Sequence, residues 1–317
     1  MFVGHGALAF AIVALAAHAA GFDRQRTLSL GILAGAFATL PDIDMVYALA
    51  GLGTVPTGGS TSLVESFWSA STVVHRSMTH SLVLALPATV TFALIGRSGR
   101  GTAASVLLGT GIVATAAIAS GPLMAAIAIA FVVAGLLIGW YAGRSGLGGW
   151  SVGIAAMVGL ATHPFGDVLT GQPPELLYPL AVEVFDGRVW LSADPTVHLL
   201  GAFGVELAAI WLGVLAFVHL RETNPWTFLR PRAALGASYA FAVLFLPVPT
   251  VDWAYPFVFS VLAVGMVGVL PVRKRLPGGM TAVTTGLAGV SVAAVAYTLA
   301  YLLLDAAPLL AQASQAF

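Results

Sequence analysis

Long apolar stretches recur along the whole chain and restrict its fold more than any other feature. A helix that crosses a bilayer needs about 20 apolar residues, with a range of about 17–25. The chain is 59% hydrophobic and only 8% charged, whereas soluble domains carry about 25% charged residues. The sequence therefore predicts an all-α, polytopic membrane helix bundle. About ten transmembrane helices are expected, at residues 3–21, 28–50, 78–96, 102–119, 123–142, 150–170, 199–219, 233–250, 254–271 and 280–304.

The basic residues predict how these helices are oriented, because cytoplasmic loops collect Lys and Arg. Eleven of the 13 basic residues fall on alternate loops, and only Arg76 and Arg188 fall on the others. The sequence thus predicts a multi-pass protein of the cell membrane with both termini on the extracytoplasmic side. The eleven residues are Arg24, Arg26, Arg97, Arg100, Arg144, Arg221, Arg230, Arg232, Arg273, Lys274 and Arg275.

Charge and cysteine content exclude several classes of function. The net charge is zero and no basic tail is present, so no nucleic-acid partner is expected. The chain has no cysteine, which excludes disulfides, thiolate metal sites and cysteine nucleophiles. The partner that remains is the lipid bilayer.

The tight turn "ASGPL" at 119–123 is expected to join two of the helices.

Two long polar segments fall between helices on the predicted outer side, at residues 51–77 and 171–198. Segments of this length in compact proteins are often functional caps. We divide the chain into a metal-site membrane domain at residues 1–220 and a three-helix membrane extension at residues 221–317.

Ionisable residues inside membrane helices are rare and usually mark a site. Here they gather in four regions that the predicted topology places at one depth on the outer side, which indicates a single converging site. Histidine nitrogens and carboxylate oxygens suit zinc, and also manganese or iron. These candidate residues are His5, Asp42, Asp44, His75, Arg76, Thr79, His80, His163 and Asp167.

The spacing of these residues sets conditions on the site. His163 and Asp167 are four residues apart, so they share one helix face. Asp42 and Asp44 are two apart, so both reach the site only if Pro41 breaks the helix; otherwise one ligates and the other orients a histidine. His75 and His80 are five residues apart, so both can reach one site only if His75 lies in a turn before the helix. His198 is a further histidine on the outer side, and its membership of the site is left open.

The motifs "GHG" (4–6), "LPDID" (40–44), "HRSMTHS" (75–81) and "HPFGDVLT" (163–170), followed by "LLYPL" (176–180), resemble the YdjM-type family of membrane-bound metal-dependent hydrolases. Their order and spacing match over about residues 1–180. The order of His and Asp residues is also similar, more loosely, to that of the helical zinc phospholipase C and nuclease proteins.

The family resemblance implies metal-site roles for seven residues and roles in the second shell or in substrate contact for Arg76 and Thr79. One departure from the pattern is Pro164, which predicts that His163 lies at the start of a helix. The seven implied metal-site residues are His5, Asp42, Asp44, His75, His80, His163 and Asp167.

The resulting hypothesis is a metal-dependent hydrolase that acts on a phosphoester or lipid-linked substrate at the outer membrane interface. It would hold one or two divalent ions, and zinc is the metal expected before manganese or iron. Asp44 would take the proton from metal-bound water, and Arg76 would hold an anionic group of the substrate. Two alternatives remain: a transporter or ion-binding membrane protein, and a scaffold with a structural metal.

Overall fold

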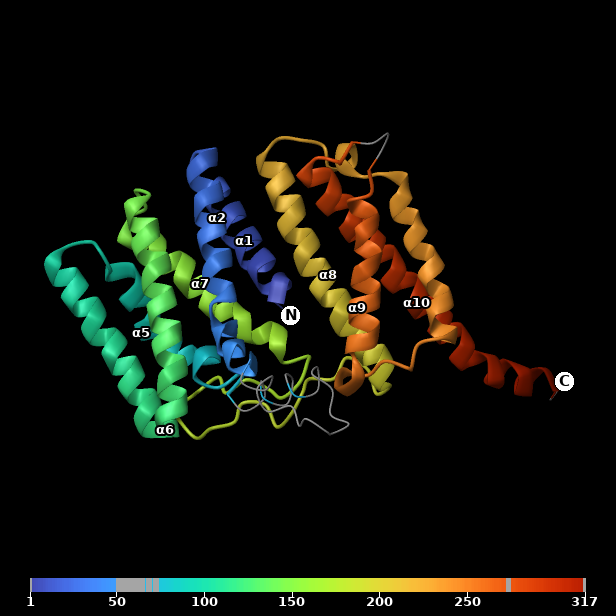
Figure 1. Cartoon of the computed structure of the whole chain (residues 1–317), viewed down its shortest axis with the longest axis horizontal. Coiled ribbons are helices and arrows are strands. Elements are labelled where there is room, and N and C mark those ends of the chain that lie inside the picture. Colours follow the sequence, from blue (N-terminus) through green and yellow to red (C-terminus); the bar gives the residue numbers. More distant parts are fainter. Residues whose placement is uncertain (1, 50–65, 67–69, 71–73, 272–274, 316–317) are drawn as a thin grey trace. The chain divides into compact units, whose positions relative to one another are not determined.

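The computed structural model describes residues 2–49, 66, 70, 74–271 and 275–315, with the backbone alone at residue 2 and at residues 306–315. Every regular element in these ranges is a helix (Figure 1), so the predicted all-α fold is confirmed. Most of the predicted outer segment 51–77 lies outside the described residues.

The chain forms two compact units, Met1–Val189 and Trp190–Phe317. The division at residue 220 into a metal-site domain and an extension stays a prediction. The first unit contains α1 (Phe2–Ala19), α2 (Arg24–Thr39), η1 (Pro41–Tyr47), η2 (Met78–His80), α5 (Leu82–Leu94), α6 (Gly99–Arg144) and α7 (Gly149–Asp167).

A proline separates α2 from the short 3-10 helix η1. Pro41 has no backbone N–H, and its ring clashes with the carbonyl four residues earlier, so the α-helix ends before it. The chain bends by 41° between Arg24–Thr39 and Pro41–Tyr47. This break meets the condition under which Asp42 and Asp44 can both face one site.

The long helix α6 is a hairpin of two helical halves. Gly121 has φ 83° and ψ −171°, a conformation that favours glycine, and Pro122 follows it at the start of the second half. The predicted turn at 119–123 is therefore confirmed, and the two halves lie side by side (Figure 1). A Cβ on Gly109 of the first half would lie 2.8 Å from Val132 Cγ1 of the second, which shows how closely they pack.

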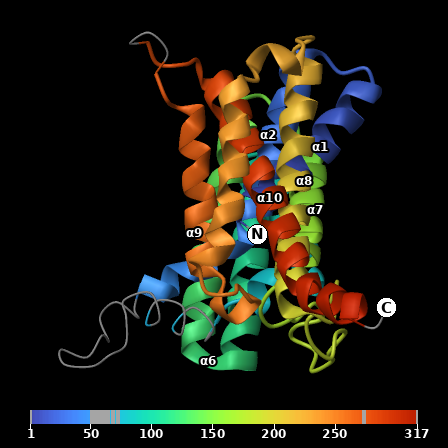
Figure 2. The ribbon, with the colours of Figure 1, turned by 90° about the vertical axis from the view of Figure 1, so that its right-hand side faces the viewer.

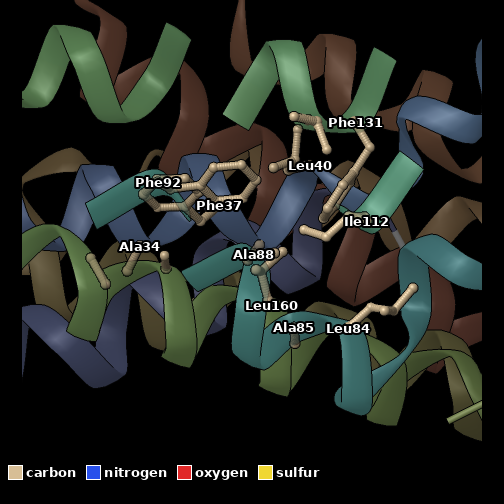
Figure 3. Close-up of a cluster of buried hydrophobic side chains, with 14 of the residues drawn as sticks. Ala34, Phe37, Leu40, Leu84, Ala85, Ala88, Phe92, Ile112, Phe131 and Leu160 are labelled. Atoms are coloured by element: carbon tan, nitrogen blue, oxygen red, sulfur yellow. The ribbon is translucent and has the colours of Figure 1, made fainter. Parts of the chain in front are cut away.

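Aromatic and small side chains fill the core of the first unit. Phe37 of α2 stacks on Phe92 of α5 with ring centroids 5.6 Å apart, and both side chains are fully buried. Phe131 and Ile112 from the two halves of α6 join them, as does Leu160 of α7 (Figure 3). This core holds α2, α5, α6 and α7 together.

The second unit contains α8 (Pro195–Leu220), η3 (Pro225–Phe228), η4 (Pro231–Leu244), η5 (Val251–Trp253), α9 (Tyr255–Val264), η6 (Gly265–Gly268) and α10 (Gly279–Gln315). Helix α10 packs against η4 and η6 (Figure 2). Its Tyr297 is fully buried beside Phe257, with ring centroids 5.0 Å apart. The Tyr239 hydroxyl and Ser260 Oγ, 2.6 Å apart, tie η4 to α9.

All ten segments predicted as transmembrane contain helix, although some are short. Within the described residues, α6, α8 and α10 are long and apolar enough to cross a membrane, and the bent pair α2–η1 makes a fourth candidate. Helix α1, α5 and the α9–η6 pair are apolar but shorter. Ten crossings and two extracytoplasmic termini therefore stay predictions.

Candidate metal centre

The seven residues predicted as metal ligands are linked by contacts at one end of the first unit. Helix ends or turns bring each of them there: α1 begins at Phe2, η1 begins at Pro41, η2 precedes α5, and α7 ends at Asp167. Most of the side chains are deeply buried, which is unusual for groups that carry charge. Their relative exposure is 3% for His5, 12% for Asp42, 16% for His75, 2% for Asp167 and 0% for Asp44, His80 and His163.

Four side chains bring one ligand atom each to a common point. His80 Nε2 lies 3.0 Å from His163 Nε2 and 3.1 Å from Asp167 Oδ2. His163 Nε2 lies 3.5 Å from Asp167 Oδ2 and 3.5 Å from Asp42 Oδ1. These four side chains form one group that could hold a metal ion, with all ligand atoms within 4.8 Å of one another.

The spacing within this group fits tetrahedral coordination. Bonds of about 2.0–2.1 Å to a central zinc place tetrahedral ligand atoms about 3.3 Å from each other. Four of the six separations between ligand atoms are 3.0–3.5 Å and bracket that value, and the two between Asp42 and the side chains of His80 and Asp167 are within 4.8 Å. Two imidazole nitrogens and two carboxylate oxygens are also a donor set that zinc, manganese and iron accept.

The hydrogen bond on the far side of His163 determines which ring nitrogen faces the group. His163 Nδ1 lies 2.6 Å from the carbonyl oxygen of Ala38. A carbonyl only accepts, so Nδ1 carries the hydrogen and Nε2 of the neutral ring presents its lone pair. A histidine that ligates a metal is commonly held in this way.

The Thr79 hydroxyl likewise determines which ring nitrogen of His80 faces the ligand group. Thr79 Oγ1 donates to Asp44 Oδ2 at 2.7 Å, since the carboxylate can only accept. Thr79 Oγ1 is therefore the acceptor for His80 Nδ1 at 2.9 Å. Nε2 of the neutral His80 ring then faces His163 Nε2 with its lone pair, where it can bind a metal ion or accept a proton from His163.

Asp44 lies at the centre of a second group, with His75 and His80, that could also hold an ion. Hydrogen-bond donors already occupy its oxygens. His75 Nδ1 lies 2.8 Å from Oδ1, and Thr79 Oγ1 and the Arg76 N–H donate to Oδ2 at 2.7 and 3.2 Å. Asp42 and Asp44 thus belong to two different groups that could hold an ion, and Asp44 also contacts His75 directly and His80 through Thr79. The roles of ligand and proton acceptor for Asp44 stay predictions.

His5 contacts the ligand group from outside. Its Nε2 lies 3.3 Å from Asp167 Oδ1, the oxygen of Asp167 that is turned away from His80. Its ring packs on that of His163 with centroids 4.0 Å apart. His5 therefore restrains both Asp167 and His163 without offering a ligand atom to either group.

Arg76 binds the C-terminal end of α7. Its Nη1 donates to the carbonyl oxygens of Asp167 at 3.0 Å, of Gln172 at 2.8 Å, and of Thr170. Its Nη2 donates to Thr170 Oγ1 at 3.0 Å and lies 3.4 Å from Asp167 Oδ1. The predicted role of Arg76 as a clamp for an anionic substrate stays a prediction, and both terminal nitrogens have these internal partners.

Helix α7 continues through Pro164 and ends at Asp167. The expectation that His163 starts a helix is therefore wrong. Pro164 has no N–H to donate to the Leu160 carbonyl, so the last turn of α7 lacks one intrahelical hydrogen bond but remains helical. The helix keeps His163 and Asp167 one turn apart on the same face, as their spacing predicts.

The sequence did not single out the part of the 171–198 segment that binds the histidine motif. The Leu82 N–H donates to Leu176 O at 2.9 Å, Ser81 Oγ donates to Tyr178 O at 2.6 Å, and Ser77 Oγ donates to Glu175 Oε2 at 2.6 Å. The motif "LLYPL" was the available signal. His198 belongs to the second unit, where its Nδ1 accepts from the Leu191 N–H at 3.1 Å.

Comparison with protein families gives one match, to the model of the YdjM inner membrane protein family over residues 1–307. The chain belongs to this family. The resemblance over about residues 1–180 therefore extends much further, and α8 to α10 of this YdjM family member are part of the family's sequence and not an addition outside it. Comparison with curated proteins and with solved structures found no match.

Proposed function

We propose that this inner membrane protein is a metal-dependent hydrolase that acts on a phosphoester or lipid-linked substrate at the extracytoplasmic membrane interface. One observation carries the proposal: a ring nitrogen each of His80 and His163 and a carboxylate oxygen each of Asp42 and Asp167 lie within 4.8 Å of one another. A divalent ion held there lowers the pKa of a bound water towards about 7 and so supplies a nucleophile at neutral pH.

The exposure of the ligand group indicates where a substrate would enter. His80, His163 and Asp167 are at most 2% exposed, whereas the Asp42 side chain is 12% exposed. Catalytic zinc sites commonly combine three protein ligands with an open position. Of the four side chains in the group, we assign the three most buried as those that would hold the ion, so that the fourth position next to Asp42 would be left to water. Asp42 Oδ1, on the open side, accepts the proton of the attacking water.

Residues that surround the ligand group hold its side chains in place. Asp44 fixes the ring nitrogen that His80 presents, through Thr79, and Ala38 does so for His163. His5 and Arg76 contact Asp167 Oδ1, which leaves Oδ2 for the ion. Such outer contacts are worth about 10–100-fold in metal affinity.

The distribution of basic residues supports an extracytoplasmic site. In the first unit, the basic residues at 24, 26, 97, 100 and 144 fall at the helix ends opposite to those that carry the ligands. Basic residues mark the cytoplasmic side. A site near a membrane boundary also suits a lipid substrate that approaches through the bilayer.

The test uses the full chain, purified in detergent. Its metal content is measured by mass spectrometry, and hydrolysis is assayed with bis-(p-nitrophenyl) phosphate, a phospholipid and a polyprenyl diphosphate. Wild type should carry a stoichiometric divalent ion and cleave at least one substrate. Asp42→Asn should keep the metal and lose at least 100-fold in kcat, and the control His18→Ala, at the opposite end of α1, should keep both.

Two results would overturn the proposal. Wild type without bound metal at neutral pH would reject the metal site. Retained metal without hydrolysis would favour a structural metal or ion transport instead. Sidedness is tested separately, because a chain without cysteine accepts single-cysteine labels. On intact spheroplasts a membrane-impermeant maleimide should label Glu183→Cys, and it should not label Ser145→Cys.

A further inference from the structure

An apolar groove runs along the α6 hairpin, away from the ligand group. One hollow of about 240 Å³ is lined by residues 106–113 of the first half of α6 and by residues 129–136 of the second half. A second hollow of about 360 Å³ extends from it to Ile95 and Trp140. Val133 and Leu136 line both hollows, so they form one continuous feature, which we call the α6 groove.

The length of the α6 groove matches one leaflet of a bilayer. Its wall on the second half of α6 extends from Ile129 to Trp140. At 1.5 Å per residue this is about 16 Å, and half of a hydrocarbon core of about 30 Å is about 15 Å. The rims of the groove are exposed, with Val133 at 49% and Leu137 at 61%, whereas Val132 is buried. A single acyl chain is an occupant of suitable length and polarity.

The groove ends at a cluster of positive charge. Because α6 folds back at Gly121, its two ends, Gly99 and Arg144, lie at the same end of the hairpin. The Arg144 guanidinium lies over the Trp140 ring, 4.8 Å from its centroid, and the Cβ position of Gly96 lies 3.3 Å from Trp140 Cδ1. The mouth of the groove is therefore flanked by Arg144 on one side and by the α5–α6 connection on the other.

No acidic residue balances this charge in the surrounding sequence. Between residues 81 and 166 the only Asp, Glu, Lys or Arg residues are Arg97, Arg100 and Arg144. Arg97 has internal partners, since Nε donates to Ala93 O at 3.1 Å and Nη1 donates to Leu147 O. Arg100 and Arg144 are exposed. A guanidinium binds a phosphate through paired hydrogen bonds.

We propose that the α6 groove binds an anionic phospholipid, with one acyl chain along Val133 and Leu136 and its phosphate between Arg100 and Arg144. Trp140 lies at the level where the acyl chain meets the headgroup, a depth that tryptophan favours in membrane proteins. A neutral lipid has the same chain but leaves the arginines without a net negative partner, so the headgroup charge provides the selectivity.

Native mass spectrometry of the full chain, released from nanodiscs, tests this site. The probes are dioleoyl phosphatidylglycerol and dioleoyl phosphatidylcholine, which share their acyl chains and differ in charge. Wild type should retain phosphatidylglycerol at least five-fold more than phosphatidylcholine. The double variant Arg100→Gln/Arg144→Gln should reduce this preference to about one-fold.

Two further variants separate a defined site from a general charge effect. Arg24→Gln/Arg26→Gln removes the same charge from α2 and should keep the preference, because these arginines lie outside the α6 hairpin. Val133→Phe narrows both hollows and should lower retention of phosphatidylglycerol without changing the charge. Equal loss in the α2 double variant, equal retention of both lipids, or a dimer that Val133→Phe disrupts would each overturn the proposal.

Discussion

His80 Nε2 and His163 Nε2 lie 3.0 Å apart, and the hydrogen bond on the far side of each ring turns a lone pair towards the other. Two neutral imidazoles with these tautomers would repel each other at this distance, and either a metal ion or a proton held between the two nitrogens removes that repulsion. Asp42 and Asp167 add two carboxylate oxygens at the same point. These four side chains therefore form a group that could hold a metal ion.

Removing either histidine should remove the metal. His163→Ala and His80→Ala should each lower the metal content of the purified protein at least ten-fold, because each deletes one of the convergent donors. Metal bound at 100 times its dissociation constant adds about 2.7 kcal/mol to stability, so chelation should lower the Tm of wild type. Measured metal content and Tm in both variants equal to those of wild type would contradict the assignment.

The hydroxyl of Thr79 should control metal affinity without touching the metal. Thr79→Val removes the relay between Asp44 and His80, and the expected loss in affinity is about 10–100-fold by competition titration. Thr79→Ser keeps the hydroxyl and should stay near wild type. Thr27→Val serves as the control, because Thr27 is a buried threonine that donates to Phe22 O at 3.3 Å at the other end of α2.

Gly159 should be required for the position of His163. It lies one turn before His163 on α7, and an added Cβ would lie 2.6 Å from Ala34 O and 2.7 Å from Ala38 N. Gly159→Ala should push α7 away from α2, break the bond from His163 to Ala38 and cost about 1–3 kcal/mol. Thermal unfolding and metal titration should both register this change.

Gly153→Ala provides a control for Gly159→Ala on the same helix. Its new Cβ would lie 3.5 Å from Ala93 Cβ, an ordinary van der Waals contact. We expect unchanged metal affinity and stability equal to or slightly above that of wild type, since alanine favours a helix interior by about 0.5–1 kcal/mol. If both substitutions change metal affinity and stability equally, the close packing of Gly159 against α2 is not what positions His163.

Arg76 should act on Asp167 and not on a substrate. Arg76→Gln deletes the bonds to the end of α7, so metal affinity should fall about ten-fold. Arg76→Lys should not restore it, because a lysine ammonium cannot reproduce the two-nitrogen fork. If Arg76 instead binds an anionic substrate, metal affinity will stay unchanged while KM for a phosphoester rises.

Most of the secondary structure could be predicted because apolar runs and breakers are local signals. Gly121 and Pro122 mark the turn of the α6 hairpin, and Pro41 marks the end of α2. Pro164 led to a wrong start for a helix, because a proline favours the first turn of a helix, whereas here α7 continues through it with one hydrogen bond fewer. The number of membrane crossings could not be predicted in the same way, because several apolar helices, such as α1 and α5, are shorter than a full membrane span.

The residue types in the site followed from the sequence alone, since histidine and aspartate are costly in a membrane helix unless they have partners. The different contacts of the two aspartates did not follow from the sequence. Asp42 and Asp44 are equivalent by composition and spacing, yet one faces His163 and the other receives Thr79 and His75. That choice depends on the close approach of α7 to α2 and on the turn before α5, and both arise from contacts between residues far apart in the chain.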